Sequence, residues 1–357
     1  MPLTNCPKCQ SPLGDLKARF CAECGTMVPL EAVPGNDPLV GRIVSERFRV
    51  LKILGEGGMG KVYLAEQRMG STTRKIALKT LQPDLVGDPQ LIARFHRETE
   101  TVIQLQHPNT ITFYEFGETS EGLLFIAMEY VQGESLAVIL ARGALEPMRV
   151  ERVVVQICGS LAEAHGLGIV HRDLKPDNII LTNRAGQTDF VKVLDFGIAK
   201  RTEFADTNTS KLTKQGMVLG TPPYMSPEQF TGQTLDARSD VYSLAVMVYE
   251  MRAGQLPFSA HTPWEWATQH LTTPPRPFES LNPALAQRLQ ARHKGAILHA
   301  LAKNRDERPP SEIAFLQEFS GRTDTGEQWL AVSSARTPFP PTAYASAMPA
   351  TGQGTPA

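Results

Sequence analysis

Six polar side chains, most of them able to carry charge, lie inside an apolar segment, VHRDLKPDNIIL at residues 170–181. A charge that is buried without a partner or a metal is costly. The flanking Val, Ile and Leu favour burial, so the segment is either a solvated loop or a site at which a bound group compensates the charges. In the second case, we expect the charges to be incompletely compensated without that group.

Composition describes a globular protein with room for one domain of roughly 250–300 residues plus appendages, or for two ordinary domains. The chain has 357 residues, 41% of them apolar, and a net charge of -1. This balance provides no global field that would steer the chain to nucleic acid or anionic lipid. No apolar run is long enough to span a membrane, and the N-terminus MPLTNCPKCQ lacks the features of a signal peptide. We therefore expect a cytoplasmic protein.

The chain divides into four zones. Four of its five cysteines precede residue 25, and a Pro/Gly-rich stretch follows them. The last zone is rich in Pro, Ala, Thr and Ser and has few periodic apolar residues, which predicts disorder. We expect a cysteine-bearing head at 1–28, a linker at 29–40, a globular domain at 41–320 and a disordered tail at 321–357.

The globular zone begins with strands and continues with helices. Short apolar alternations between glycine breaks predict the strands, and apolar residues at helical spacing predict the helices. One of these helices is apolar nearly all round, which is typical of a central buried helix. A strand-rich lobe followed by a helix-rich lobe predicts an α+β protein with a ligand site between the lobes. The predicted strands are 47–54, 61–67, 75–81 and 123–131, and the helices are 89–105, 149–168 and, apolar all round, 239–254.

A glycine pattern, LGEGGMGKVY, contains Gly55, Gly57 and Gly60 in G-x-G-x-x-G spacing, followed by Val62. Glycine lets a turn approach a phosphate closely and offer backbone N–H groups. Alone the pattern is weak, and a plain glycine turn is the alternative. A dinucleotide-binding fingerprint would need a helix directly after it. A predicted strand follows instead, which excludes that interpretation.

Three further residues have ordinary explanations when taken singly. Lys79 ends the apolar strand IALK, Glu98 lies on the predicted helix, and Asp195 stands between an apolar strand and a Phe-Gly pair in VLDFGIAK. Together, in this order and with HRDLKPDN between them, they match a motif set. The chain resembles the eukaryotic-like protein kinases, over about residues 47–319 and in their bacterial Ser/Thr branch. The resemblance rests on the glycine pattern, Lys79, Glu98, HRDLKPDN, DFG and SPE at 226–228.

The resemblance implies a bilobal protein kinase fold and a site for ATP and Mg²⁺. The glycine turn would cover the phosphates, and Lys79, paired with Glu98, would contact the α- and β-phosphates. Asp195 and Asn178 would each hold a Mg²⁺. The polar run would then exist to receive metal and phosphate.

The same resemblance assigns the chemical step and the adenine site. Asp173 would accept the proton of the attacking hydroxyl, and Lys175 would neutralise charge on the γ-phosphoryl group. Lys175 and Thr221, which would bond the catalytic Asp and Lys, favour serine and threonine substrates. The adenine would lie among Leu54, Val62, Ala77 and Ile180, with Met128 as gatekeeper and Glu129 to Val131 as the hinge.

Other residues are architectural in this family. His171 would support the catalytic loop, Glu228 and Arg308 would form a buried ion pair, and Asp240 would anchor the loop backbone. Cys158 lies on an apolar helix stripe and is interpreted as core.

Two other classes of function compete with an active protein kinase. A pseudokinase scaffold would recruit partners through the head and tail, but it would not need Lys79, Asp173, Asn178 and Asp195 together. A small-molecule kinase would not need the hydroxyl-rich segment that ends in SPE. We therefore expect a serine/threonine protein kinase that binds ATP and protein substrates.

The segment between DFG and SPE predicts regulation. Arg172 precedes Asp173, the arrangement in which a basic pocket receives a phosphate on the activation loop. Thr213 is the first candidate for autophosphorylation, followed by Thr209 and Ser210. A merely polar loop is the alternative.

The head carries Cys6, Cys9, Cys21 and Cys24 in C-x₂-C-x₁₁-C-x₂-C spacing. Four thiolates aimed in pairs at one ion make a tetrahedral Zn²⁺ site, which predicts a small structural zinc ribbon. Two disulfides or a redox pair are the alternatives, and a reducing compartment disfavours the disulfides. The ribbon has too little core to fold without metal. Its partner, and that of the tail, stay open.

Overall fold

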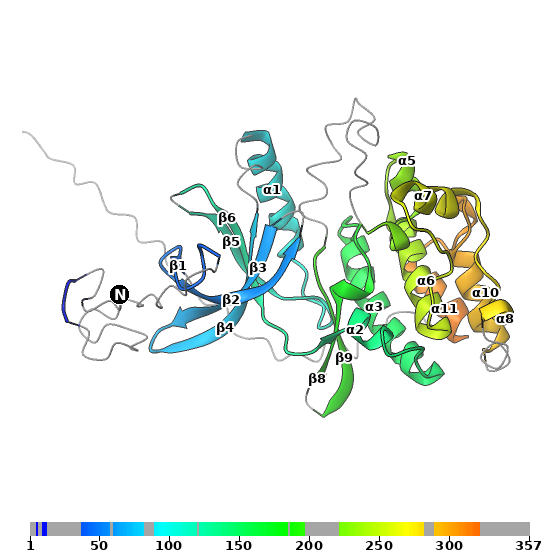
Figure 1. The fold of residues 1–357 in the computed structure, drawn as a ribbon, viewed down its shortest axis with the longest axis horizontal. Coiled ribbons are helices and arrows are strands. Elements are labelled where there is room, and N and C mark those ends of the chain that lie inside the picture. The colour runs from blue at the N-terminus through cyan, green and yellow to red at the C-terminus, as the bar shows by residue number, and fades with distance from the viewer. Residues whose placement is uncertain are drawn as a thin grey trace, which may run out of the picture. The chain divides into compact units, whose positions relative to one another are not determined.

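The computed structural model describes residues 5, 9–12, 37–57, 60–81, 89–119, 121–184, 186–196, 221–281 and 289–321. From residue 43 onward, the chain forms a six-stranded antiparallel sheet in the order β1-β2-β3-β4-β6-β5 (Figure 1). Its strands are β1 (Ile43–Val44), β2 (Phe48–Gly57), β3 (Gly60–Met69), β4 (Thr72–Leu81), β5 (Phe113–Glu118) and β6 (Leu124–Glu129).

The two faces of this sheet are covered by different parts of the chain. Side chains alternate along a strand, so Ile76 and Leu78 on β4 face one way and Ala77 and Leu81 face the other. Ile76 and Leu78 join a cluster with Phe48, against which residues 39 and 40 pack. On the opposite face, helix α1 (Pro89–Val102) contributes Phe95 to a cluster with Leu81. The sheet therefore has a face covered by residues 39–44 and a face covered by α1.

A second, three-stranded sheet and the helices α2, α3 and η2 follow β6. The sheet has the order β7-β8-β9, with β7 (Glu134–Ser135), β8 (Ile179–Arg184) and β9 (Gln187–Val193). Between β7 and β8 lie α2 (Leu136–Leu140), α3 (Pro147–Gly166) and the 3₁₀ helix η2 (Pro176–Asn178). The strand β9 ends two residues before Asp195, and β8 begins directly after residues 170–178, the expected catalytic loop. The pairing of Ile179 with Val193 therefore places this loop and the DFG motif at adjacent strand ends.

The rest of the described chain is helical. Its elements are η3 (Pro222–Tyr224), α5 (Pro227–Thr231), α6 (Ala237–Ala253), α7 (Pro263–Thr272), α8 (Phe278–Leu281), α10 (Ala291–Ala300), η4 (Arg305–Glu307) and α11 (Glu312–Ser320). Helix α6 begins at the N-cap Asp236 and ends at Gly254, whose φ of +70° suits glycine.

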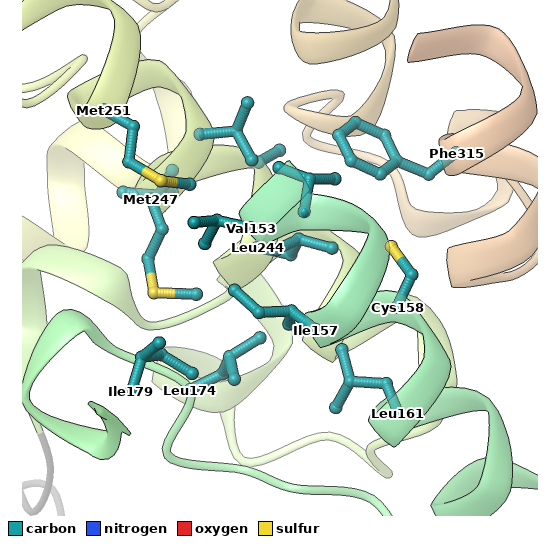
Figure 2. Packing of buried hydrophobic residues seen from close by; sticks show 14 of the residues in the cluster. Val153, Ile157, Cys158, Leu161, Leu174, Ile179, Leu244, Met247, Met251 and Phe315 are labelled. Atoms are coloured by element: carbon teal, nitrogen blue, oxygen red, sulfur yellow. The ribbon is translucent and has the colours of Figure 1, made fainter. Parts of the chain in front are cut away.

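Helices α3 and α6 form the centre of the hydrophobic core. Figure 2 shows Val153, Ile157 and Leu161 of α3 packed near Leu244 and Met247 of α6. The catalytic-loop residue Leu174 and Ile179 lie at the edge of the same cluster, and Phe315 of α11 at another. This packing joins the polar run of residues 170–181 to the most buried part of the molecule.

The structure confirms most of the predicted elements. Helix α6 is buried on nearly all sides, α3 buries the predicted stripe, and Cys158 is fully buried. The boundaries differ by a few residues: α1 ends at Val102, and β2 continues through the glycines to Gly57. Strand β5 is missing from the prediction because its residues are only half-buried and a register shift interrupts their pairing.

Within the described ranges, no helix combines the length and the apolar character that crossing a membrane requires. The predicted tail at 321–357 lies outside the described residues after its first position. The head is described only at residues 5 and 9–12.

Candidate active site

The glycine turn is the tip of the β2–β3 hairpin. Gly55 and Gly57 lie on β2, and Gly57 is paired with Gly60 on β3. Gly60 has a φ of +142°, and a Cβ atom there would lie 1.8 Å from the carbonyl oxygen of Thr80 on β4. This position therefore requires glycine, and the turn lies close to the strand that carries Lys79.

Lys79 and Asp195 meet although 116 positions separate them in the chain. Lys79 Nζ donates to Asp195 Oδ1 at 2.7 Å. Burial alone would raise the pKa of Asp195, but the charge and hydrogen bond of Lys79, with smaller contributions from His171 and Lys175, lower it. Asp195 is therefore an anionic oxygen donor at neutral pH.

Two residues at the site have left-handed backbone. Asp195 has a φ of +49° and Arg172 a φ of +65°. Such conformations are uncommon for residues other than glycine, and they concentrate at functional sites. The predicted partner Glu98 lies on α1 and is partly buried; its pairing with Lys79 stays a prediction.

Asp240, on α6, holds the backbone of the catalytic loop. Its Oδ2 accepts from the N–H of His171 at 2.7 Å and its Oδ1 from the N–H of Arg172 at 3.0 Å. The carboxylate is 1% exposed. The expected anchoring role of Asp240 is confirmed in this geometry.

His171 links the catalytic loop to the DFG segment. Its Nε2 lies 2.8 Å from the carbonyl oxygen of Leu194, and its Nδ1 accepts from the N–H of Asp173 at 3.3 Å. The ring packs on Phe196 with 4.7 Å between centroids. Burial lowers the pKa of His171, so the neutral tautomer with a proton on Nε2 fits both contacts.

The catalytic-loop side chains are bonded to one another. Lys175 Nζ lies 2.7 Å from Thr221 Oγ1 and 3.3 Å from Asp173 Oδ2. Asn178 Nδ2 donates to the Asp173 carbonyl oxygen at 2.8 Å, so its amide oxygen is the atom it can offer to a cation. This amide oxygen and the carboxylate of Asp195 are oxygen donors, the kind that Mg²⁺ prefers.

These contacts bear on one expectation. The polar run of residues 170–181 was expected to be incompletely compensated without a bound group. Within the fold, Lys175 Nζ is bonded to Thr221 Oγ1 and lies 3.3 Å from Asp173 Oδ2, and Asp240 accepts from the N–H groups of His171 and Arg172. These contacts help the run to lie beside the core, and its need for a bound group stays a prediction.

Part of the predicted adenine site is brought together. Ala77 and Met128, paired across β4 and β6, share a cluster to which Val62 and Val131 are added. Leu54, in contrast, is 40% exposed. Ile180 is half-buried on β8, and neither residue belongs to that cluster.

Glu129, in the expected hinge, has a backbone group that is already bonded within the fold. Its N–H donates to the Thr112 carbonyl oxygen at 2.8 Å, so this N–H is not available to a ligand. Its Oε2 receives Lys192 Nζ at 2.7 Å, and that lysine is 2% exposed. This pair was not predicted, although the lysine inside the apolar strand FVKVL indicates that a buried partner exists.

The buried ion pair of the helical part is confirmed. Arg308 donates through Nη1 and Nη2 to the two carboxylate oxygens of Glu228, at 2.8 and 2.9 Å. Both side chains are at most 3% exposed.

Several predicted residues lie outside the described ones. These are Thr209, Ser210 and Thr213 of the activation segment, and Cys6, Cys21 and Cys24 of the head. Cys9 is described, and its Sγ lies 3.4 Å from Ser11 Oγ. Searched within the described residues, no group of three or more His, Cys, Asp and Glu side chains is placed to hold a metal.

Comparisons with known proteins agree with the motifs. Residues 48–319 match the family described as "Protein kinase domain". The chain is 44% identical over 309 residues to "Serine/threonine-protein kinase pkn3" of Myxococcus xanthus, covering 85% of this chain and 56% of that relative. It is 40% identical over 269 residues to "Serine/threonine-protein kinase PknB" of Mycobacterium tuberculosis, covering 74% and 41%. The chain thus spans about half, or less, of the length of these curated relatives.

A solved structure shows the same fold. The kinase domain of PknI from Mycobacterium tuberculosis aligns with a TM-score of 0.60 and 27% sequence identity. The alignment covers 80% of this chain and 99% of that one.

Proposed function

Because the chain belongs to the protein kinase domain family, we propose that it transfers the γ-phosphoryl group of Mg-ATP to serine and threonine hydroxyls of proteins. The observation that carries this proposal is the 2.7 Å contact between Lys79 Nζ and Asp195 Oδ1. It brings a cation suited to phosphate and an anion suited to Mg²⁺ to one place, beside the catalytic loop. Curated relatives named as serine/threonine-protein kinases support the same reaction.

The residues present fit ATP and Mg²⁺. Asp195 and the amide oxygen of Asn178 would hold the metal, Lys79 would hold phosphate oxygens, and Gly60 leaves the glycine turn without a side chain. Bound Mg²⁺ would neutralise the charge of the phosphates and orient them.

The chain's own residues would then handle the acceptor. The Asp173 carboxylate would take the proton of the substrate hydroxyl. As it does so, the hydroxyl oxygen would bond to the γ-phosphorus, and the bond from that phosphorus to the oxygen that bridges it to the β-phosphorus would break. The Lys175 ammonium would face the charge on the transferring group. Its 2.7 Å hydrogen bond to Thr221 Oγ1 supports a serine/threonine kinase, because this pairing ties the catalytic loop to the segment expected to hold the substrate.

The test is transfer of radiolabelled phosphate from ATP to the protein itself and to a generic basic protein. Asp173→Asn and Lys79→Met should each reduce the rate by about 100-fold or more, since both remove groups that act on the reacting phosphoryl group. Asp306→Asn, the same chemical change at a side chain that is 73% exposed, should match the wild type. Phosphoamino acid analysis should find phosphoserine and phosphothreonine. Equal incorporation by all four proteins would refute the assignment.

Activation by autophosphorylation is part of the proposal. The activation segment carries Thr209, Ser210 and Thr213, and Arg172 in the catalytic loop would pair with a phosphate there. Phosphopeptide mapping after incubation with Mg-ATP should find Thr213 first. A fully active enzyme with an unmodified segment would contradict this part.

For the head, we propose a structural Zn²⁺ held by Cys6, Cys9, Cys21 and Cys24. An antiparallel bridge between Asn5 and Pro12 encloses the first cysteine pair, and Gln10, directly after Cys9, has a φ of +62°. Both features suit a tight turn that aims two thiolates at one ion. Atomic spectroscopy should find one zinc per chain, lost in Cys9→Ser. A protein that contains no zinc and has two disulfides among these cysteines would contradict the zinc site. The cytoplasmic location stays a prediction.

A further inference from the structure

Asp37 is a buried acid outside the catalytic machinery described above. Its carboxylate is 4% exposed. Oδ2 receives Lys61 Nζ at 2.6 Å, and Oδ1 receives Tyr63 Oη at 2.9 Å and the Leu39 N–H at 3.0 Å. Both long-range partners lie on β3, the strand that leaves the glycine turn.

Asp37 begins a segment that is docked on the sheet. Residues 37–44, here called the N-terminal arm, lie between the four-cysteine head and β2. Leu39 and Val40 pack on the cluster that contains Tyr63. The arm also exchanges backbone hydrogen bonds with Val50 of β2, through the Gly41 N–H and the Arg42 carbonyl oxygen, at 3.0 and 2.9 Å.

The alternation of β3 connects this contact to the nucleotide face. Lys61 and Tyr63 point to the side of the arm, so Val62 between them points to the opposite side. There Val62 packs with Ala77 and Met128, the cluster expected to receive adenine. Asp37 therefore bonds Lys61 and Tyr63 on one face of β3, and Val62 packs on the opposite face.

Lys61 also holds the two strands of the glycine turn together. It faces Glu56 in the ladder, one position on each strand from the Gly57–Gly60 pair that closes the hairpin, and its Nζ lies 3.4 Å from Glu56 Oε1. Lys61 thus connects Asp37 to both strands that form the turn.

The charges of the contact are stable at neutral pH. Burial would raise the pKa of Asp37, but the hydrogen bonds from Lys61, the Leu39 N–H and Tyr63 outweigh it and lower the pKa. The hydrogen bond to Asp37 raises the pKa of Lys61. An ionised Asp37 therefore faces a protonated Lys61.

We infer that Asp37 is a positioning residue of the nucleotide site: by holding Lys61 and Tyr63 from the docked arm, it fixes the strand that carries Val62 and the glycine turn. The inference rests on the proposed function. It assigns to the arm, which precedes β2 and includes β1, a role in nucleotide affinity. Asp37 does not touch the nucleotide and acts through β3.

The test measures the dissociation constant of a fluorescent N-methylanthraniloyl ATP, together with KM for ATP and kcat, on the full chain. Asp37→Asn removes the charge and keeps the shape. We expect it to weaken nucleotide binding and raise KM by about three- to tenfold, as loss of one charged hydrogen bond would, with kcat changed less than about twofold. Lys61→Met should do the same, and Glu121→Gln, at an exposed acid in the turn between β5 and β6, should match the wild type.

The double variant Asp37→Asn/Lys61→Met separates positioning from direct contact. If Asp37 acts through Lys61, the double variant binds nucleotide no more weakly than the weaker single variant. Effects that multiply would overturn the inference, as would wild-type affinity in both single variants. Because the Lys61 side chain is 33% exposed, Lys61→Met keeps the test decisive if Asp37→Asn fails to fold. A wild type that neither binds the nucleotide nor transfers phosphate would instead refute the proposed function, and this inference with it.

Discussion

His165, at the end of α3, connects this helix to Asp240 of α6 and Glu312 of α11, and the protonation of its ring should make the stability of the protein depend on pH. Its Nε2 lies 2.8 Å from Asp240 Oδ2 and its Nδ1 2.5 Å from Glu312 Oε2, and the ring is 9% exposed. Both ring nitrogens face carboxylates, so the doubly protonated imidazolium fits the site. Burial alone would lower the pKa of His165, but the two carboxylates raise it to about 10.

The sign and size of the effect follow from this value. Because the folded pKa of His165 lies above its ordinary value of 6.5, the stabilisation is complete below about pH 6.5 and is lost as the pH rises toward 10. At about 1.4 kcal/mol per pKa unit, the protonated histidine contributes on the order of 4 kcal/mol to the free energy of unfolding at neutral pH. We expect roughly 3 kcal/mol of this to be lost between pH 7 and pH 10.

Denaturant unfolding followed by tryptophan fluorescence, at intervals from pH 6.5 to 10, measures this loss. His165→Gln carries every other titratable group, so the difference between the two pH profiles isolates His165. The variant should be less stable at pH 7, because Asp240 and Glu312 lose their shared cation, and its profile should be flatter by roughly 3 kcal/mol over the range. Parallel profiles for the two proteins would refute the reasoning.

Three further changes have expected outcomes. Arg308→Met should destabilise the protein by about 3–5 kcal/mol in denaturant unfolding, because it leaves the Glu228 carboxylate buried without its charge partner; adding Glu228→Gln should recover part of the loss. Gly60→Ala should lower the melting temperature, since its Cβ would lie 1.8 Å from a carbonyl oxygen, whereas Gly55→Ala, whose Cβ meets nothing within 4 Å, should not. Thr221→Val removes the 2.7 Å hydrogen bond to the catalytic-loop lysine and should lower kcat about tenfold with little change in KM for ATP, while Thr221→Ser should keep most of the activity.

The sequence could predict those parts whose residues are fixed by local spacing. The stripe of α3 and the all-round apolar character of α6 follow from helical periodicity, and both helices are found where that periodicity predicts them. The polar run of residues 170–181 and the DFG motif are each an unbroken stretch of sequence, so the family resemblance identified both directly. The ion pair of Glu228 with Arg308 could be predicted only through that resemblance, because no periodicity relates two residues 80 positions apart.

The contacts that the sequence could not predict join segments with no motif in common. Asp37 lies in the stretch predicted to be a linker, because its Pro and Gly neighbours indicate a turn. Its partners Lys61 and Tyr63 come more than 20 residues later, directly after the glycine pattern, and no motif connects them to Asp37. The Lys192–Glu129 pair crosses from β9 to the end of β6. His165 resembles an ordinary polar residue at a helix end, and its second carboxylate comes from α11, 147 positions later. In each case, the tertiary path of the chain decides the partner.

The contact between Lys79 and Asp195 explains how the site can be built before any ligand arrives. Each charge is the partner of the other at 2.7 Å, so neither is left buried alone, which would be costly. With a magnesium–nucleotide bound, Asp195 would face a cation and Lys79 an anion, so each would exchange one partner for another of the same sign. Asp240 differs, because its partners are the loop backbone and His165, which no ligand replaces. The fold therefore combines one ion pair that a bound nucleotide would exchange with an anchor of the loop backbone that it would leave unchanged.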